Sequence, residues 1–237
     1  MNSTYRITLR SVGTFDSIRI ILVNYLFLPL VSLLMFLLIA FNSNQDYTRS
    51  LIGTIVTTGI TTSIGIISAS VVYDQNIGLL EDFFSIRPAF HKYWIPKFVI
   101  ANITATIEIV VLGGIGLVSL GETNLLPKLF LALPLIILIS SLLGYFSANW
   151  GMHHENPYWL TNIMTASLVL LAGLIIPVKT YPLWLKLFAE LLPISNLLDW
   201  ILSKNFLDQG LLIIIAKLFA WYIICLTSSR IKQNILI

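Results

Sequence analysis

The sequence predicts an all-α integral membrane protein with six transmembrane helices. Its 237 residues are 57% hydrophobic and only 11% charged, whereas soluble domains carry about 25% charged residues. The mean hydropathy is +0.89. Because one span needs about 20 apolar residues, the chain has room for about six spans and for no sizeable soluble domain. We therefore expect residues 1–237 to form one transmembrane domain.

The chain begins with a segment of mixed character. Residues 1–19 contain three arginines and one aspartate, with apolar residues at roughly helical spacing. This pattern is typical of a basic helix that lies in the membrane interface and leads into a span. The first span is expected at residues 20–41, which are long enough to cross the membrane and lack a convincing signal-peptide cleavage site.

The second expected span, residues 50–72, is rich in threonine, serine and glycine. Small residues at positions 57, 61, 65 and 69 line up on one helix face, which lets a neighbouring helix approach closely. This stripe is a packing face, the lining of a polar pathway, or both. Packing is the favoured interpretation, because such stripes are common wherever transmembrane helices meet.

Residues 73–97 form the longest polar interruption between two apolar runs and have a helical pattern of their own. One face is apolar, with Tyr73, Ile77, Leu80 and Phe84, and the other is polar, with Asp74, Gly78, Glu81, Asp82 and Ser85. Asp74 is expected to cap the helix and Pro88 to end it near Ile86 or Arg87. The helix is too short to span. It either lies in the headgroup layer or docks a partner protein.

Four further spans are expected at residues 98–120, 125–149, 159–178 and 210–227. Residues 179–209 are too polar to face lipid, yet they contain many apolar side chains. Pro182 and Pro193 divide them into two short helical pieces. Such a segment enters a membrane only where protein covers its free backbone groups, so we expect a lid or re-entrant hairpin.

The distribution of lysine and arginine predicts the orientation. With the N-terminus inside, eight of these residues fall in inner segments and five in outer ones. Because cytoplasmic loops carry the excess of positive charge, both termini are expected in the cytoplasm and residues 179–209 outside.

Two charged residues lie inside expected spans, Glu108 and Lys217. Each costs about 2.5–3.5 kcal/mol at the centre of a membrane helix, so an interaction must offset that cost. Their similar depth allows an ion pair between the third and sixth spans. The functional alternative is a proton or ion relay.

No segment of the chain predicts a catalytic site. His153, His154 and Glu155 are adjacent on a loop, which is not the one-face spacing of a metalloprotease helix, so no metal site is expected. The sequence contains neither a phosphate-binding G-x-x-x-x-G-K-[ST] loop nor a G-x-S-x-G elbow. The single Cys225 forms no internal disulfide.

Two stretches carry a resemblance to a known family. They are YDQNIGLLEDFFSIRPAFHKYWIPKF, after the second span, and LIIPVKTYPLWLKLFAELLPISNLLDWI, after the fifth. Together with the order of the spans, which covers nearly the whole chain, they resemble a permease subunit of the ABC-2-type exporter family. The second stretch is the more specific of the two.

The resemblance implies roles for particular segments. Residues 74–87 would be a coupling helix that contacts a cytoplasmic ABC ATPase through Asp74, Gly78, Glu81, Asp82, Ser85 and Arg87. Residues 1–19 would be the connecting helix, and Pro177, Pro182 and Pro193 would shape an external gate. Pathway-lining candidates are Thr54, Thr58, Thr62 and Gly65 with Asn162 and Thr165.

The resemblance also implies the partners. A second permease, identical or a sister chain, would complete the pathway, and membrane lipid would surround it. ATP and Mg would bind the partner ATPase, so no cofactor is expected on this chain, and no nucleic-acid partner is expected.

The leading hypothesis is therefore an exporter subunit in the cell membrane that moves a small amphiphile, peptide or lipid-like cargo out of the cytoplasm. One alternative is a stand-alone secondary carrier or ion channel that uses Glu108 and Lys217. Another is a membrane immunity or scaffold protein, which would need neither ATP nor the polar face of residues 74–87.

Overall fold

A computed structural model describes the chain except residues 1–2, 80–89, 153, 204, 207 and 236–237. The described residues form helices and contain no strand, which confirms the all-helical prediction. The helices are α1 (Ser3–Ser11), α2 (Ile18–Leu22), α3 (Leu28–Asn42), α4 (Tyr47–Asn76), α6 (Phe90–Ser119), α7 (Leu126–Gly151), α8 (Trp159–Leu171), α9 (Leu183–Leu191), α10 (Ile194–Leu202) and α11 (Gln209–Ile235). Short 3-10 turns lie at Gly13–Phe15, Thr123–Leu125 and Val178–Thr180, and a π-helical turn at Val23–Phe27 joins α2 to α3.

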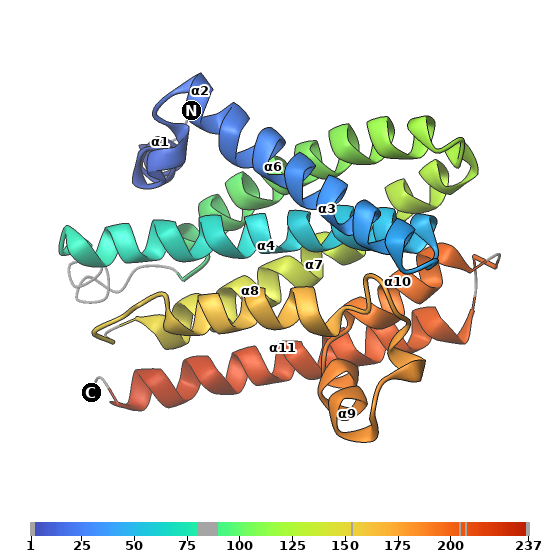
Figure 1. Cartoon of the computed structure of the whole chain (residues 1–237). Helices are drawn as coiled ribbons and strands as arrows, with labels where there is room; N and C mark the ends of the chain where they lie inside the picture. The colour runs from blue at the N-terminus through green and yellow to red at the C-terminus, as the bar shows by residue number, and fades with distance from the viewer. Residues whose placement is uncertain (1–2, 80–89, 153, 204, 207, 236–237) are drawn as a thin grey trace.

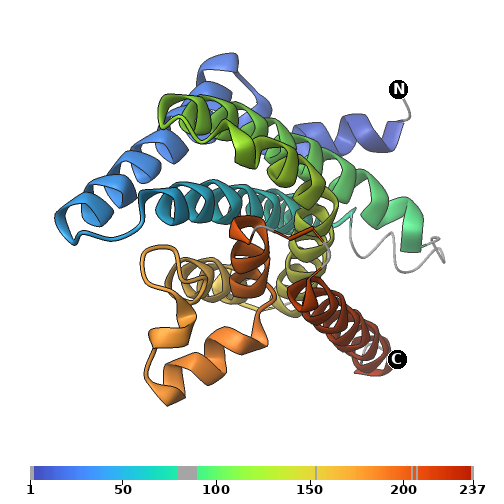
Figure 2. The ribbon, with the colours of Figure 1, turned by 90° about the vertical axis from the view of Figure 1, so that its right-hand side faces the viewer.

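Helix α4 is the centre of the bundle. It packs against α3, α6, α7 and α8, with α3 and α6 on one side and α8 and α11 on the other (Figure 1, Figure 2). In its most apolar window 72% of the residues are buried, against 11% in the first span and 17% in α11. The isoleucines that α4 contributes to the core, such as Ile55, Ile60 and Ile64, are fully buried.

Glycines let α4 and its neighbours approach closely. A Cβ atom at Gly59 of α4 would lie 2.5 Å from the side chain of Ile109 in α6. A Cβ atom at Gly144 of α7 would lie 3.4 Å from the Cα of Ile64. The stripe at positions 57, 61, 65 and 69 is different, because a Cβ at Gly65 would meet nothing within 4 Å. The stripe is therefore mixed, since Thr57 is buried at 2% exposure whereas Gly65 faces open space.

The number of spans differs from the prediction. Five helical segments in the described part are long and apolar enough to cross a membrane: Ile18–Asn42, Tyr47–Asn76, His91–Ser119, Thr123–Gly151 and Gln209–Ser229. The predicted fifth span, residues 159–178, is instead the 13-residue helix α8, which is about 20 Å long. The helix ends because Gly173 adopts a left-handed φ of +72°, a conformation that glycine adopts readily.

The predicted start of the coupling helix also needs correction. Asp74 does not cap a new helix, because α4 continues through it to Asn76. Ile77 follows as the C-cap, and Gly78 has a φ of +73°, as expected for the glycine that ends a helix. Glu81, Asp82, Ser85 and Arg87 lie outside the described residues. Helix α6 begins at Phe90 and contains Pro96.

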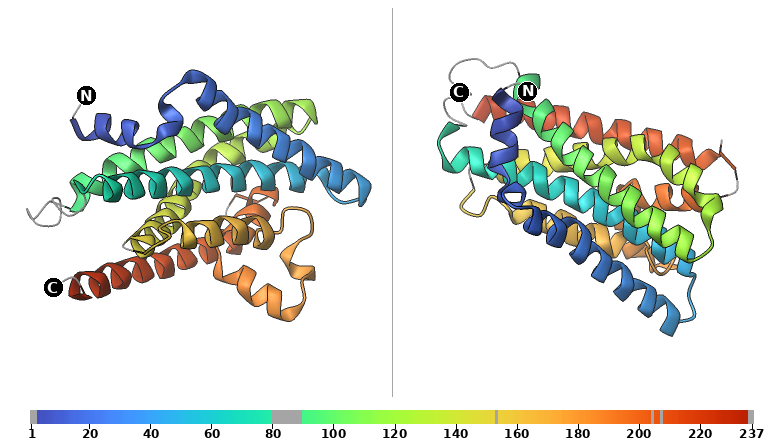
Figure 3. Two further views of the ribbon diagram at one scale, coloured as in Figure 1. Left: turned by 60° about the vertical axis from the view of Figure 1, so that its left-hand side comes forward. Right: turned by 90° about the horizontal axis from the view of Figure 1, so that it is seen from above.

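The segment after α8 contains two short helices, α9 and α10, in the region where two helical pieces were predicted. Both lie at the end of the bundle where α3 turns into α4 (Figure 1). The two chain termini, and the ends of α4 and α6 that flank residues 80–89, lie at the opposite end (Figure 3). The bundle therefore has two distinct ends, and α4 runs from one to the other.

Candidate functional site

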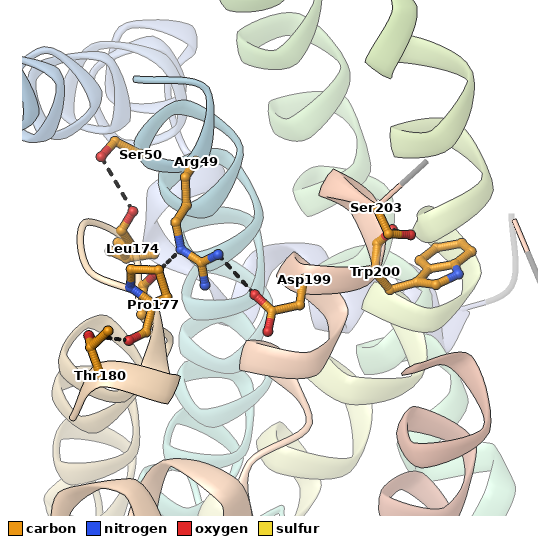
Figure 4. A network of polar contacts seen from close by, with 9 residues as sticks. Arg49, Ser50, Leu174, Pro177, Thr180, Asp199, Trp200 and Ser203 are labelled. Carbon is orange, nitrogen blue, oxygen red and sulfur yellow. Dashed lines mark hydrogen bonds and ion pairs between the residues drawn. The ribbon is translucent and has the colours of Figure 1, made fainter. Parts of the chain in front are cut away.

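At the end that holds α9 and α10, Arg49 is the centre of a polar network (Figure 4). This residue lies in the first turn of α4, after the N-cap residue Asp46, and is only 7% exposed. Its Nη1 donates to Asp199 Oδ1 of α10 at 2.9 Å, and its Nε donates to the carbonyl of Gly173 at 2.9 Å. Arg49 thus fastens α10 and the chain after α8 to the start of α4.

The predicted gate prolines lie in the segment that Arg49 fastens. Each is the residue immediately before a short helix: Pro177 before Val178–Thr180, Pro182 before α9 and Pro193 before α10. Their carbonyls accept hydrogen bonds from the following turns, for example from the backbone N–H of Thr180 at 3.0 Å. The prolines therefore set the start of each helical piece.

Lys217 of α11 belongs to the same end of the bundle. Its Nζ donates to Asn196 Oδ1 of α10 at 2.5 Å and to the carbonyl of Leu192 at 3.4 Å. The predicted ion pair between Lys217 and Glu108 is therefore wrong. Equal depth in two spans does not place two side chains on facing sides, and α10 supplies nearer oxygen acceptors.

A second polar site lies at the opposite end, between α4 and α6. Lys97 Nζ donates to Asp74 Oδ2 at 2.5 Å, and both residues are buried, at 3% and 1% exposure. The ammonium also lies 4.4 Å from the centre of the Tyr93 ring. This pair joins the last turn of α4 to the second turn of α6, on the two sides of residues 80–89.

A third group of polar contacts lies within the bundle. Asn102 Oδ1 accepts hydrogen bonds from Ser63 of α4 at 3.1 Å and Ser140 of α7 at 2.9 Å, while its Nδ2 donates to Ser141 at 2.8 Å. This single amide therefore connects three helices through well-satisfied hydrogen bonds. The Asn102 side chain is therefore a packing contact, because both its oxygen and its nitrogen are hydrogen-bonded to neighbouring helices.

Glu108 is different, since no hydrogen bond reaches its carboxylate among the described residues. The side chain is 2% exposed, and no ion pair in that part of the chain includes it. Thr58 and Thr62 of α4 lie beside the carboxylate, and Tyr25 of the π-helical turn is within electrostatic reach. The polar side chains named here as neighbours of Glu108 thus carry hydroxyl groups, and none of them is a cation.

The predicted pathway residues are divided by the structure. On α4, Thr58, Thr62 and Gly65 are half-buried and share a face. Thr54 is 1% exposed, and its hydroxyl donates to the carbonyl of Ser50 at 2.7 Å. This corrects its assignment to an open lining surface, because the side chain is enclosed by the core.

On α8, Asn162 is exposed and Thr165 is half-buried. The hydrogen bond that joins α8 to α4 runs from Thr161 to Ser68, at 2.8 Å. The threonine hydroxyl at position 165 donates to the carbonyl of Thr161 at 2.9 Å. The two α8 candidates thus lie near the contact between these helices, one turn or less from Thr161.

Sequence reasoning missed three residues of these sites: Arg49, Lys97 and Asn102. Arg49 and Lys97 were counted only as loop charges that set orientation, and Asn102 was read as part of an apolar run. A signal was present, since each is a strongly polar residue within or next to a span, where burial without a partner is costly. Their partners, however, are 150, 23 and 39 residues away.

Comparison with known families gives one match. The model of the family described as ABC-2 type transporter matches residues 5–206. This range contains α4, the Asp74–Lys97 pair, the network around Arg49 and the segment with α9 and α10. A search among curated proteins finds no match.

Proposed function

The chain belongs to the ABC-2 type transporter family, and from that premise we propose that it is the membrane subunit of an ATP-driven exporter. As a multi-pass permease component it is not itself the catalyst. In our proposal a cytoplasmic ABC ATPase on a separate chain binds ATP and Mg, and a second permease completes the pathway. The cargo is a small amphiphile, peptide or lipid-like molecule that leaves the cytoplasm across the cell membrane.

The observation that carries this proposal is the continuity of α4 between the two polar sites. The helix has 30 residues and is therefore about 45 Å long. Arg49 near its start holds α10, and Asp74 near its end holds α6. A rigid helix transmits a displacement that a loop would absorb, so movement at one end of α4 reaches the other.

We place the ATPase contact in residues 78–87, between the two helices that the Asp74–Lys97 pair joins. Gly78, Glu81, Asp82, Ser85 and Arg87 remain our candidates for this contact. We no longer propose that Asp74 contacts the ATPase, because its carboxylate is buried against Lys97. Its proposed role is to hold the base of the contact segment in a fixed position.

The alternative of a stand-alone carrier loses support. It used Glu108 and Lys217 as a relay, and Lys217 binds Asn196 and the carbonyl of Leu192 of the α9–α10 segment. A scaffold or immunity protein remains as an outcome of the experimental test, because it would need no ATPase.

The test is a pull-down of the full chain in detergent with the products of neighbouring genes, followed by an ATPase assay. We expect a P-loop ATPase to co-purify and the charge-reversed variant Glu81→Lys/Asp82→Lys to lose it. The matched control is Glu190→Lys, an exposed reversal on α9 at the opposite end, which should retain the ATPase. A well-folded chain that recovers no ATPase would overturn the exporter proposal.

A further inference from the structure

The carboxyl group of Glu108 is buried, and no ion pair among the described residues includes it. Both oxygens are inaccessible and accept no hydrogen bond among the described residues. An ionised carboxylate buried without a partner is destabilising by several kcal/mol. Lys217, the cation that its depth suggested as a partner, is engaged with α10. A protein that retains such a group within a membrane span has a use for it.

Hydroxyl groups lie beside the carboxylate, and two of them belong to Thr58 and Thr62. The Thr58 hydroxyl donates to the carbonyls of Thr54 at 2.9 Å and Ile55 at 3.1 Å, so its lone pairs are what it presents to a ligand. The Tyr25 hydroxyl is hydrogen-bonded to Thr14 at 2.6 Å. A carboxylate with acceptor oxygens beside it complements an ammonium, which has three donors and no acceptor.

The face of α4 beside Glu108 has room for a ligand. Thr58, Thr61, Thr62 and Gly65 are each half-buried along this face, and a Cβ atom at Gly65 would meet nothing within 4 Å. The π-helical turn of the first span contacts α6, and only 11% of the apolar window of that span is buried. Its π-helical turn carries Tyr25, and such turns are frequent at functional sites.

We propose that Glu108, with Thr58, Thr62 and Tyr25, binds the protonated amine of a cationic amphiphile. The apolar part of that ligand would lie along the half-buried face of α4, and its ammonium would pair with the carboxylate. This inference rests on the proposed export function and names the class of its cargo.

The test uses two probes of the same length. N-dansyl-1,10-decanediamine carries one ammonium, and its N-acetyl derivative is neutral. Their binding to the full chain in lipid nanodiscs is measured by dansyl fluorescence, with empty nanodiscs subtracted. We expect the wild type to prefer the amine at least tenfold and Glu108→Gln to bind both probes equally. Glu122→Gln, in the turn between α6 and α7, is the matched control and should keep the preference.

Two results would overturn the inference: equal binding of both probes by the wild type, or an unchanged preference in folded Glu108→Gln. If Glu108→Gln does not fold, Thr62→Val decides, because it removes an acceptor oxygen and leaves the carboxylate. A severalfold loss of preference supports the site, and an unchanged preference overturns it. Co-purification of the ATPase is scored separately, so the cargo class can fail while the exporter proposal stands.

Discussion

Asp74 and Lys97 show how burial changes the value of an ion pair. Both side chains are at most 3% exposed and their charged atoms are 2.5 Å apart. Lys186 and Glu190 on α9 form a pair at 3.7 Å with side chains 43% and 52% exposed. Removing one member of a buried pair leaves an uncompensated charge, which costs about 3–5 kcal/mol. An exposed i,i+4 pair contributes only about 0.3–0.5 kcal/mol.

Lys97→Met is therefore expected to destabilise the protein strongly, by about 3–5 kcal/mol, because it leaves Asp74 buried and unpaired. The double variant Asp74→Asn/Lys97→Met should recover part of this loss, since no charge remains buried. The measurement is the midpoint of thermal unfolding of the purified protein in detergent. Lys186→Met is the control, with little expected change. Equal effects of Lys97→Met and Lys186→Met would contradict the buried-pair account.

At the scale of the helices, the contacts of α4 depend on where its glycines lie. Gly59 faces the fully packed side chain of Ile109, whereas Gly65 faces open space. Two substitutions that add the same methyl group should therefore differ in effect. This difference separates a packing face from an open face on one helix.

Gly59→Ala is expected to destabilise the bundle by about 1–3 kcal/mol, because the new methyl group overpacks the contact with α6. Gly65→Ala should be neutral or slightly stabilising, since alanine favours a helix more than glycine does. Thermal unfolding of the two variants side by side makes the comparison. A larger loss in Gly65→Ala than in Gly59→Ala would show that the faces are assigned the wrong way round.

Much of the helical architecture could be predicted from apolar run length, because membrane helices must satisfy their own backbone groups. What failed were the choices that depend on tertiary partners. Asp74 at the end of an apolar run has the same local pattern as an N-cap, and only Lys97 explains why α4 continues through it. Similarly, Glu108 and Lys217 lie at similar depths in their spans, but depth alone does not determine whether the two side chains face each other.

The predicted fifth span failed for a related reason. Residues 159–178 are apolar enough to cross, but the chain turns at Gly173, where its carbonyl accepts from Arg49. The turn at Gly173 is thus in contact with an arginine 124 residues earlier in the chain. The prolines, in contrast, were informative, because proline restricts the local backbone regardless of its partners.

At the scale of the whole molecule, α4 connects the end proposed to meet the ATPase with the end that holds α9 and α10. The Asp74–Lys97 pair lies at the first end, and at the second Arg49 bonds to Asp199 and to the carbonyl of Gly173. Lysine at position 49 keeps the charge but lacks the guanidinium fork that reaches both partners. Arg49→Lys should therefore weaken the connection to α10 while leaving the Asp74–Lys97 pair intact.

The most direct measurement is the distance between spin labels on the two permease copies of the purified permease–ATPase complex. The label is placed by Lys186→Cys, on the exposed side of α9, after Cys225→Ala removes the native thiol. We predict that ATP changes the distance distribution in the wild-type background and that Arg49→Lys reduces this change while ATP hydrolysis continues. An ATP-dependent change that is the same size in Arg49→Lys would contradict transmission through α4.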